Sequence, residues 1–215
     1  MAAGALKTHG ITTETVKNMI LNACAVYKNV EFEELSGWKG EPLGATSGGT
    51  KFNWETQWLD IDVDGATVLV KGVSKQKVGE SAYIEANMTE LTEKILVDAL
   101  HLEKDSGKTY KGFTAYKSKA NIGETDYLKN IALFGTKSDG KKVLIILPNA
   151  ICTEAFELET KNAEQSVFKV KFEATADVTS ENLNKLDVQI IFEGEAAAMH
   201  TNESAAKTTR KAVTE

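Results

Sequence analysis

The sequence predicts a mainly β fold of the α+β class: an antiparallel β-sandwich or barrel with one packed α-helix. Three observations support this prediction. Residues 51–89 contain two long strand-like segments joined by a protruding loop. Residues 127–192 contain further segments in which apolar and polar residues alternate. Only residues 90–101 repeat apolar positions with the period of an amphipathic helix.

Composition describes an ordinary globular chain. It has 215 residues, of which 42% are hydrophobic and 26% charged, enough for one large domain. We expect an N-terminal arm at residues 1–12, a β-domain at 13–194, and a flexible or partner-ordered tail at 195–215. Small and polar residues dominate that tail, so it buries too little apolar surface to offset the cost of ordering.

Charge and targeting signals exclude several protein classes. A net charge of −6 and a single arginine, Arg210, argue against tight binding to nucleic-acid phosphates. We see no signal-peptide pattern and no apolar run near the roughly 20 residues that span a bilayer. We therefore expect folding in a cytoplasm without membrane insertion. Cys24 and Cys152 lie in apolar runs and are expected to be buried free thiols; a disulfide would need an oxidising compartment.

The first segments are less regular. Residues 13–27 fit either a helix face or a buried strand, and we favour a strand from about Met19 after a helical or irregular turn. Residues 37–49 contain five glycines and Pro42, which indicates a loop.

The hairpin over residues 51–89 is the most regular feature. Phe52, Trp54 and Trp58 share one face of the outgoing strand, whereas Leu59, Ile61 and Val63 continue in the opposite phase. This phase slip predicts a bulge or bend in the outgoing strand. A glycine-punctuated loop over 66–76 follows. The return strand over 77–89 has one apolar face, made by Ala82, Ile84, Ala86 and Met88.

Thr89 is the expected N-cap of a helix over 90–101, and Leu91, Ile95, Ala99 and Leu102 form its apolar stripe. Residues 104–124 are expected to form a surface loop. Strands then follow at 127–136, 142–152, 156–160, 167–176 and 186–192, with a turn at 138–140.

No motif supports catalysis, a cofactor or a metal. Residues 60–65 match the opening of a calcium loop, but the twelfth position holds Lys71 in place of a glutamate. Residues 106–109 match the end of a P-loop whose first glycine is replaced by Leu102. We therefore expect a chain that is not an enzyme. Trp54 and Trp58 on one face leave an alternative open, a carbohydrate-binding β-sandwich module that stacks sugars on them.

Several short motifs, taken in their order along the chain, resemble those of a known protein family. They are residues 43–49, 61–65, 70–72, 126–131, 143–147 and 149–154. Over about residues 18–193 the chain resembles the major tail tube proteins of long non-contractile-tailed, siphovirus-like phages of Gram-positive bacteria.

The resemblance implies a structural virion protein that forms stacked hexameric rings, in which neighbouring subunits complete a continuous β-barrel with the helix outside. It implies assembly in the host bacterial cytoplasm with tape-measure, tail terminator and distal tail proteins. Double-stranded DNA would pass through transiently and without sequence specificity during ejection. The loop after the second strand would reach the neighbouring ring, through Asp64, Gly65, Val68, Val70, Lys71, Gly72 and Lys75.

Charge and sheet edges fit this role. Subunits that pair their sheet edges with neighbours remove the hazard of free edges. Carboxylates on the lumen would repel DNA phosphates, and the candidates are Glu55, Glu85, Glu157 and Glu159. Lys169 and Lys171 are opposing charges on the same kind of strand face.

Overall fold

The computed structural model describes residues 9–194, apart from residues 21–22, 35, 66, 109 and 161. Most of the expected N-terminal segment at 1–12 and the whole expected C-terminal tail at 195–215 lie outside this part of the chain. The strands are β1 (Ala25–Glu33), β2 (Gly37–Pro42), β3 (Thr46–Asp60), β4 (Lys75–Met88), β5 (Leu102–Lys104), β6 (Tyr116–Ser118), β7 (Leu128–Thr136), β8 (Lys142–Cys152), β9 (Phe168–Glu173) and β10 (Gln189–Phe192). One α-helix, α1 (Glu93–Leu100), and one 3-10 turn, η1 (Glu124–Asp126), complete the described elements. The predicted mainly antiparallel β fold with one helix is confirmed, and no described helix is long and apolar enough to cross a membrane.

The strands form two layers that meet at the end of β8. The hydrogen-bonded order is β2-β1-β7-β8-β9-β4-β3, with β10 added to β8. We call β2, β1, β7, β8 and β10 sheet I, and β9, β4 and β3 sheet II. Only Ile151 and Cys152 of β8 pair with β9. Just before them, Asn149 has a φ of 45°, and its carbonyl accepts a 2.6 Å hydrogen bond from Thr175 Oγ1. Beyond this left-handed residue, Ala150 still pairs with Leu128 of β7, and Ile151 and Cys152 then pair with β9, so the end of β8 belongs to both sheets.

The core lies between the two sheets. Sheet I contributes Val26, Ile131 and Leu147, and sheet II contributes the alternate residues of β4 and β9, among them Ile84 and Phe172. These five named side chains are at most 1% exposed. Full burial of each such side chain stabilises the fold by about 1.5–3 kcal/mol. The periodicity of β4 and β9 therefore predicted the core face correctly.

The long hairpin is confirmed, with one correction. β3 and β4 pair from Thr46–Met88 to Asp60–Lys75, and the register shifts between Gln57 and Trp58. Because Gln57 pairs with Gly79 and Trp58 pairs with Lys77, the extra residue is Val78. The expected bulge is present, but it lies in the return strand. The loop between the strands covers residues 61–74, wider than expected.

Two segments were assigned wrongly. Residues 37–49, expected as a loop, contain β2 and the start of β3; the β2 ladder with β1 overrides the local glycine signal. Residues 156–160, expected as a strand, form no ladder. Phe156 instead packs its ring on Phe168, with 5.3 Å between centroids, so its apolar character reflects a core contact.

The N-terminal and helical segments need smaller corrections. Residues 13–18 form a turn, and the strand that follows begins at Ala25. Thr92, not Thr89, caps α1, because its side chain accepts from Ile95 N at 3.3 Å. Thr89 is engaged with the carbonyl of Ala45 through its N–H at 2.9 Å and its hydroxyl at 3.3 Å. The expected loop at 104–124 contains β6 and, with β5, forms a short hairpin.

Candidate assembly surfaces

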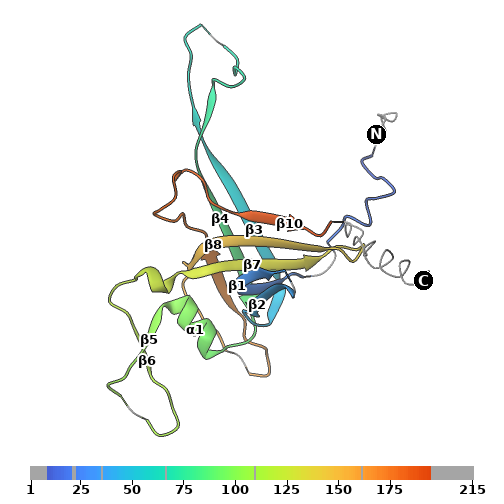
Figure 1. Ribbon diagram of the computed structural model, residues 1–215. Coiled ribbons are helices and arrows are strands. Elements are labelled where there is room, and N and C mark those ends of the chain that lie inside the picture. Colours follow the sequence, from blue (N-terminus) through green and yellow to red (C-terminus); the bar gives the residue numbers. More distant parts are fainter. Residues whose placement is uncertain are drawn as a thin grey trace, which may run out of the picture.

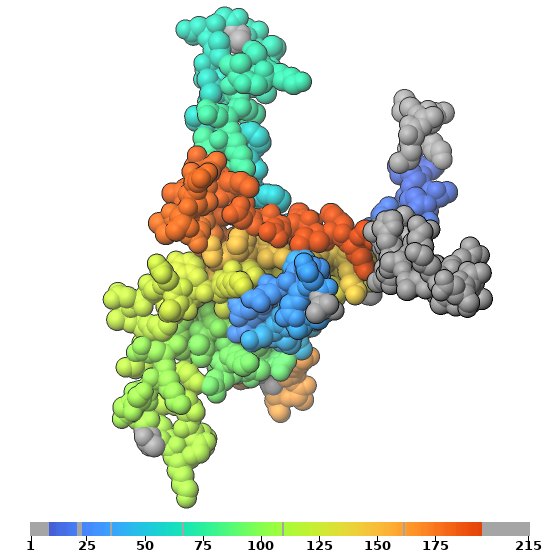
Figure 2. Space-filling model, in the orientation of Figure 1, coloured from blue at the N-terminus to red at the C-terminus, as the bar shows by residue number. Residues whose placement is uncertain are grey.

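The tip of the β3–β4 hairpin, which we call the arm (residues 58–78), stands clear of the body (Figures 1 and 2). Its large apolar side chains are exposed: Trp58, Leu59, Ile61, Val63, Val68, Leu69, Val70, Val73 and Val78. Val68 and Leu69 at the tip are 75% and 71% exposed. Exposed apolar side chains gathered on one projecting segment are typical of interaction sites.

The arm has internal order despite its exposure. Ile61 N–H donates to the Ser74 carbonyl at 2.9 Å, which extends the ladder beyond the strands. Val70 N–H donates to Ser74 Oγ at 2.8 Å, and Asp60 pairs with Lys75 across the hairpin. The residues expected to contact a neighbouring ring, Asp64, Gly65, Val68, Val70, Lys71, Gly72 and Lys75, all lie in this loop or at its closing pair. Local hydrogen bonds therefore order the base of the loop, at residues 60–61 and 70–75.

A buried carboxylate fastens the root of the arm. The side chain of Glu80 is 2% exposed, and it accepts from Trp54 Nε1 at 2.8 Å and from Leu186 N at 2.9 Å. Lys77 Nζ lies 3.1 Å from its Oε1. Burial opposes ionisation of Glu80, but these donors outweigh it and hold its pKa below the ordinary value.

Among the described strands, both ends of the strand order are free edges. β3 is 15 residues long, and its one described partner is β4. It contains no proline, the residue that most directly blocks edge pairing. β2 is the edge at the opposite end of the order. A long free strand of this kind can pair with a strand of another chain.

The outer face of sheet II is polar. Register places Lys51, Asn53 and Glu55 of β3 opposite Glu85, Tyr83 and Ser81 of β4. Lys169, Lys171 and Glu173 of β9 continue this face. Lys169 is 3.2 Å from Glu85 and 3.5 Å from Glu154, and the hydrogen bond to Glu85 raises the pKa of Lys169. The Lys171 ammonium lies 4.5 Å from the centre of the Tyr83 ring.

The four candidate luminal acids therefore separate into two pairs. Glu55 and Glu85 lie on the outer face of sheet II. Glu157 and Glu159 lie in the connection between β8 and β9, outside any strand, so the alternation used to select them does not apply there. Three lysines and three glutamates occupy the described strand positions of this face, so its charges are mixed.

The outer face of sheet I carries an apolar groove that the sequence reasoning missed. Tyr27, Val30, Trp38, Phe134 and Leu144 line a hollow of about 420 Å³. A neighbouring hollow of about 450 Å³ shares Trp38, Phe134 and Leu144, and extends to Ile191. The available signal was the run Val143–Leu147, which is apolar on both faces of its strand.

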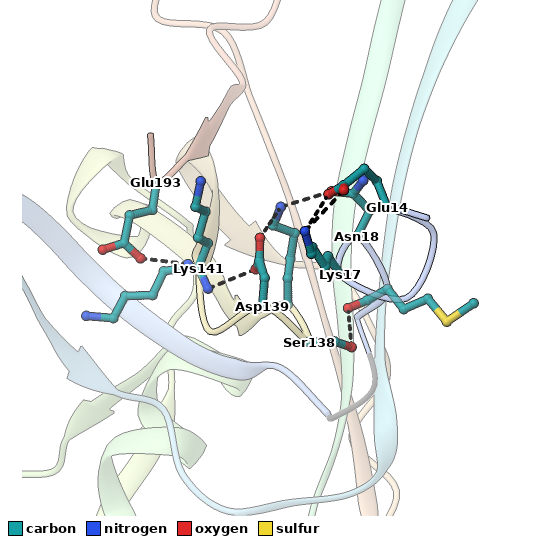
Figure 3. Close-up of polar contacts among 10 residues, drawn as sticks. Glu14, Lys17, Asn18, Ser138, Asp139, Lys141 and Glu193 are labelled. Atoms are coloured by element: carbon teal, nitrogen blue, oxygen red, sulfur yellow. Dashed lines mark hydrogen bonds and ion pairs between the residues drawn. The ribbon is translucent and has the colours of Figure 1, made fainter. Parts of the chain in front are cut away.

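Segments from both ends of the described chain meet at the β7–β8 turn (Figure 3). Ser138 donates to the carbonyl of Met19 through its N–H at 2.8 Å and its hydroxyl at 3.1 Å. Lys137 Nζ donates to Asn18 Oδ1 at 3.2 Å. Glu193, just after β10, accepts from Lys142 N–H at 2.8 Å. The chain segments leading to both termini are thus fixed at one end of the molecule.

The described residues add little support for the other candidate sites, a metal centre and a sugar-binding surface. Within the described residues, no three His, Cys, Asp or Glu side chains are grouped so as to hold a metal ion. Cys152 is a buried free thiol, as expected, whereas the free thiol of Cys24 is only partly buried; burial raises the pKa of both. Of the two tryptophans in the carbohydrate-binding alternative, Trp54 is bound through its indole nitrogen to Glu80. That bond gives Trp54 a structural role.

Comparisons with known proteins identify no family. No family model matches the sequence, and no curated protein matches it. Solved structures with some likeness include a chain in the virion of a native gene transfer agent particle: 8% identity, 78% of this chain, 95% of that chain and a TM-score of 0.38. A chain in the tail of an empty gene transfer agent particle has 9% identity, 72% and 92% coverage, and a TM-score of 0.39. A chain of the anti-feeding prophage baseplate has 8% identity, 89% and 97% coverage, and a TM-score of 0.35. Likeness at this level says nothing about function. A proposed function must therefore rest on the surfaces of this chain itself.

Proposed function

We propose that this protein is the major subunit of a phage-type tail tube, a structural virion protein whose copies form stacked hexameric rings. The observation that carries the proposal is the combination of a free 15-residue edge strand, β3, with an arm that exposes a cluster of apolar side chains. A chain that acts alone gains nothing from either feature, and both favour aggregation. A chain that polymerises uses both.

Two directions of contact account for the two features. The β3 edge would add to a strand of a neighbour within the ring and extend sheet II around a barrel. The arm, which leaves the body along the β3–β4 direction (Figure 1), would reach the next ring. Residues 1–12 and 195–215 would add contacts between subunits. The described segments next to them are held at the β7–β8 turn, through the Met19–Ser138 and Glu193–Lys142 hydrogen bonds.

The polar face of sheet II is the better lining for a water-filled lumen, because the outer face of sheet I is apolar. Glu55 and Glu85 would present carboxylates to passing DNA and repel its phosphates. Lys169 and Lys171 are held by Glu85 and Glu173, and such pairing would reduce their attraction for DNA. The tube would surround a tape-measure protein, end at terminator and distal tail proteins, and carry double-stranded DNA during ejection.

Electron microscopy of the purified full-length protein at increasing concentration tests the proposal. We expect sixfold rings and tubes. Deleting residues 65–75 should leave a folded protein that forms no tubes. Deleting residues 106–114 from the β5–β6 hairpin, the other projecting hairpin, is the matched control and should leave tube formation intact. A wild-type protein that stays monomeric at high concentration would refute the proposal.

Thiol labelling tests the lumen assignment separately. In a Cys24→Ser background, Glu55→Cys should react with small and with large polymer-linked maleimides before assembly. After assembly the small reagent should still react, while the large one should be excluded from all but the tube ends. Glu103→Cys on β5, outside the proposed lumen, should react with both reagents in both states. Equal reaction of Glu55→Cys with the large reagent in tubes would show that sheet II does not face the lumen.

A further inference from the structure

We propose that the apolar tip of the arm docks into the groove on sheet I of another copy, with Val68 and Leu69 seated against Trp38 and Phe134. This inference rests on the proposed function and specifies which two surfaces of the chain form its contact between rings. The tip and the groove are both apolar, and each is left open within the described part of one chain.

Size and shape favour this occupant. The groove consists of two adjoining hollows of about 420 and 450 Å³ that share Trp38, Phe134 and Leu144. Each lies within the range of about 300–1,000 Å³ over which protein pockets hold small apolar groups. The Val68–Leu69–Val70 run is a compact aliphatic wedge at the end of the arm, 40–75% exposed.

Charge is complementary around the two surfaces. Beside the wedge, Asp62 and Asp64 are exposed, and within the described residues neither has an ion-pair partner, whereas Asp60 is paired with Lys75. Lys39, Lys142 and Glu193 line the groove, and Lys39 is paired with Glu33. Lys142 contributes only its backbone N–H to Glu193, and its side chain makes no ion pair with a described residue. Docking would place a carboxylate of the arm near the Lys142 ammonium group.

An arm cannot fill the groove of its own chain. Its β ladder is continuous to Asp60–Lys75, and Figure 1 places the tip well away from β2 and β7. The contact is therefore heterologous, because one chain supplies the tip and a second supplies the groove. After one contact, the copy that supplied its tip still has a free groove and its partner still has a free tip, so the contact propagates along an axis as stacking requires.

Two single substitutions and their mixture test this geometry. Leu69→Asp alters only the tip, and Trp38→Asp alters only the groove; both side chains are at least 40% exposed. Each should raise the concentration needed for tubes at least tenfold, about the effect of one interface anchor. The controls Phe113→Asp and Val178→Asp, whose side chains are 80% and 85% exposed, should assemble like wild type.

Mixing the two variants gives the decisive readout. Trp38→Asp rings keep intact arms and Leu69→Asp rings keep intact grooves, so the mixture should form stacks of two rings that grow no further. No stacking in the mixture, with each variant still folded by circular dichroism, would overturn the docking geometry. A contact between two tips would be indicated if Leu69→Asp alone abolished stacking while Trp38→Asp stacked normally, which also overturns it.

Photo-crosslinking locates the contact without disturbing the groove. With p-benzoylphenylalanine at position 68, irradiated wild-type-like tubes should yield dimers in which this position is joined to residues 37–40, 134 or 142–144 of a second chain. Tubes that crosslink elsewhere would refute the docking site and leave the proposed function standing. Protein that forms no rings or tubes at all would refute both.

Discussion

The side-chain amide of Asn130 makes two hydrogen bonds to the backbone of Val30: Val30 N–H donates to Oδ1 at 2.6 Å, and Nδ2 donates to the Val30 carbonyl at 2.9 Å. The β1–β7 ladder ends one pair earlier, at Lys28–Ile131. Asn29 has a φ of 53°, and the β1–β2 register shifts between Lys28 and Glu31. A side chain thus replaces the strand bonds lost at this bulge.

This bulge also changes the face on which β1 residues lie. Val26 belongs to the core between the sheets, whereas Val30, beyond the bulge, belongs to the outer cluster with Leu144 and Ile146. Val30 lines the groove. The Asn130 amide therefore supports the core and the proposed docking surface together.

We predict that Asn130→Ala leaves the Val30 N–H and carbonyl buried without partners. Each of the two orphaned groups costs about 1–3 kcal/mol, so the free energy of unfolding should fall by about 2–6 kcal/mol. Urea denaturation followed by tryptophan fluorescence measures this change. Asn162→Ala, at an exposed turn, is the control and should change stability by less than about 0.5 kcal/mol. A loss below 1 kcal/mol at Asn130 would contradict the assigned role.

Asn29 gives a prediction from backbone conformation alone. Its positive φ is open to glycine but costs a β-branched residue about 1–2 kcal/mol. Asn29→Gly should therefore be nearly neutral, and Asn29→Val should destabilise the protein by at least about 1 kcal/mol. Thermal melts of the two variants provide the comparison. Equal melting temperatures would mean that the bulge relaxes when the residue changes.

The ion pair between Lys28 of β1 and Asp98 of α1 is largely enclosed, with side chains 9% and 15% exposed. Asp98→Ala should leave the Lys28 charge without a partner and cost about 3–5 kcal/mol. Replacing both residues, as Lys28→Met with Asp98→Leu, should recover most of that loss, because the pair is then removed without leaving a buried charge. Denaturant midpoints of the single and double variants measure the two losses. If the double variant lost as much stability as Asp98→Ala, the helix would depend on the charges themselves.

The lowered pKa of Glu80 predicts how the stability of the folded protein changes in acid. Its folded-state pKa lies below that of the unfolded chain, so the stability it contributes is present above the unfolded value, about 4.3. That stability is lost as pH falls through the lower folded value. Wild type should therefore lose more stability than Glu80→Gln as pH falls from 5 to 3, seen as a larger drop in its urea midpoint. If the stability of wild type and of Glu80→Gln fell by the same amount over this pH range, Glu80 would not be the cause of the loss.

Local patterns predicted the elements whose faces differ strongly in polarity. β4, β8 and β9 were expected close to their observed bounds, because alternation or a two-faced apolar run appears within each segment itself. The phase slip at Trp58 and Leu59 likewise predicted a bulge between β3 and β4, but it placed the bulge in the outgoing strand, whereas the extra residue is Val78 in the return strand.

Pairing between distant segments decided what the sequence left open. β2 exists because β1 offers it a ladder, despite glycines that locally favour a loop. Residues 156–160 remain outside the sheets, although their alternation resembles a strand. The groove on sheet I brings together residues from β1, β2, β7 and β8, and no single segment of sequence contains it.

The sequence by itself determined the β-rich class, the long hairpin with its exposed loop, and the helix, because each follows from side-chain periodicity within one stretch of chain. The tertiary structure alone decided which edges stay free among the described strands, where the apolar groove on sheet I forms, and where Asn130 and Glu80 find partners. Those features depend on contacts between residues far apart in the chain: 100 positions separate Asn130 from Val30, and 106 separate Glu80 from Leu186. Periodicity carries no information about such contacts, since they form only when separate elements pack together.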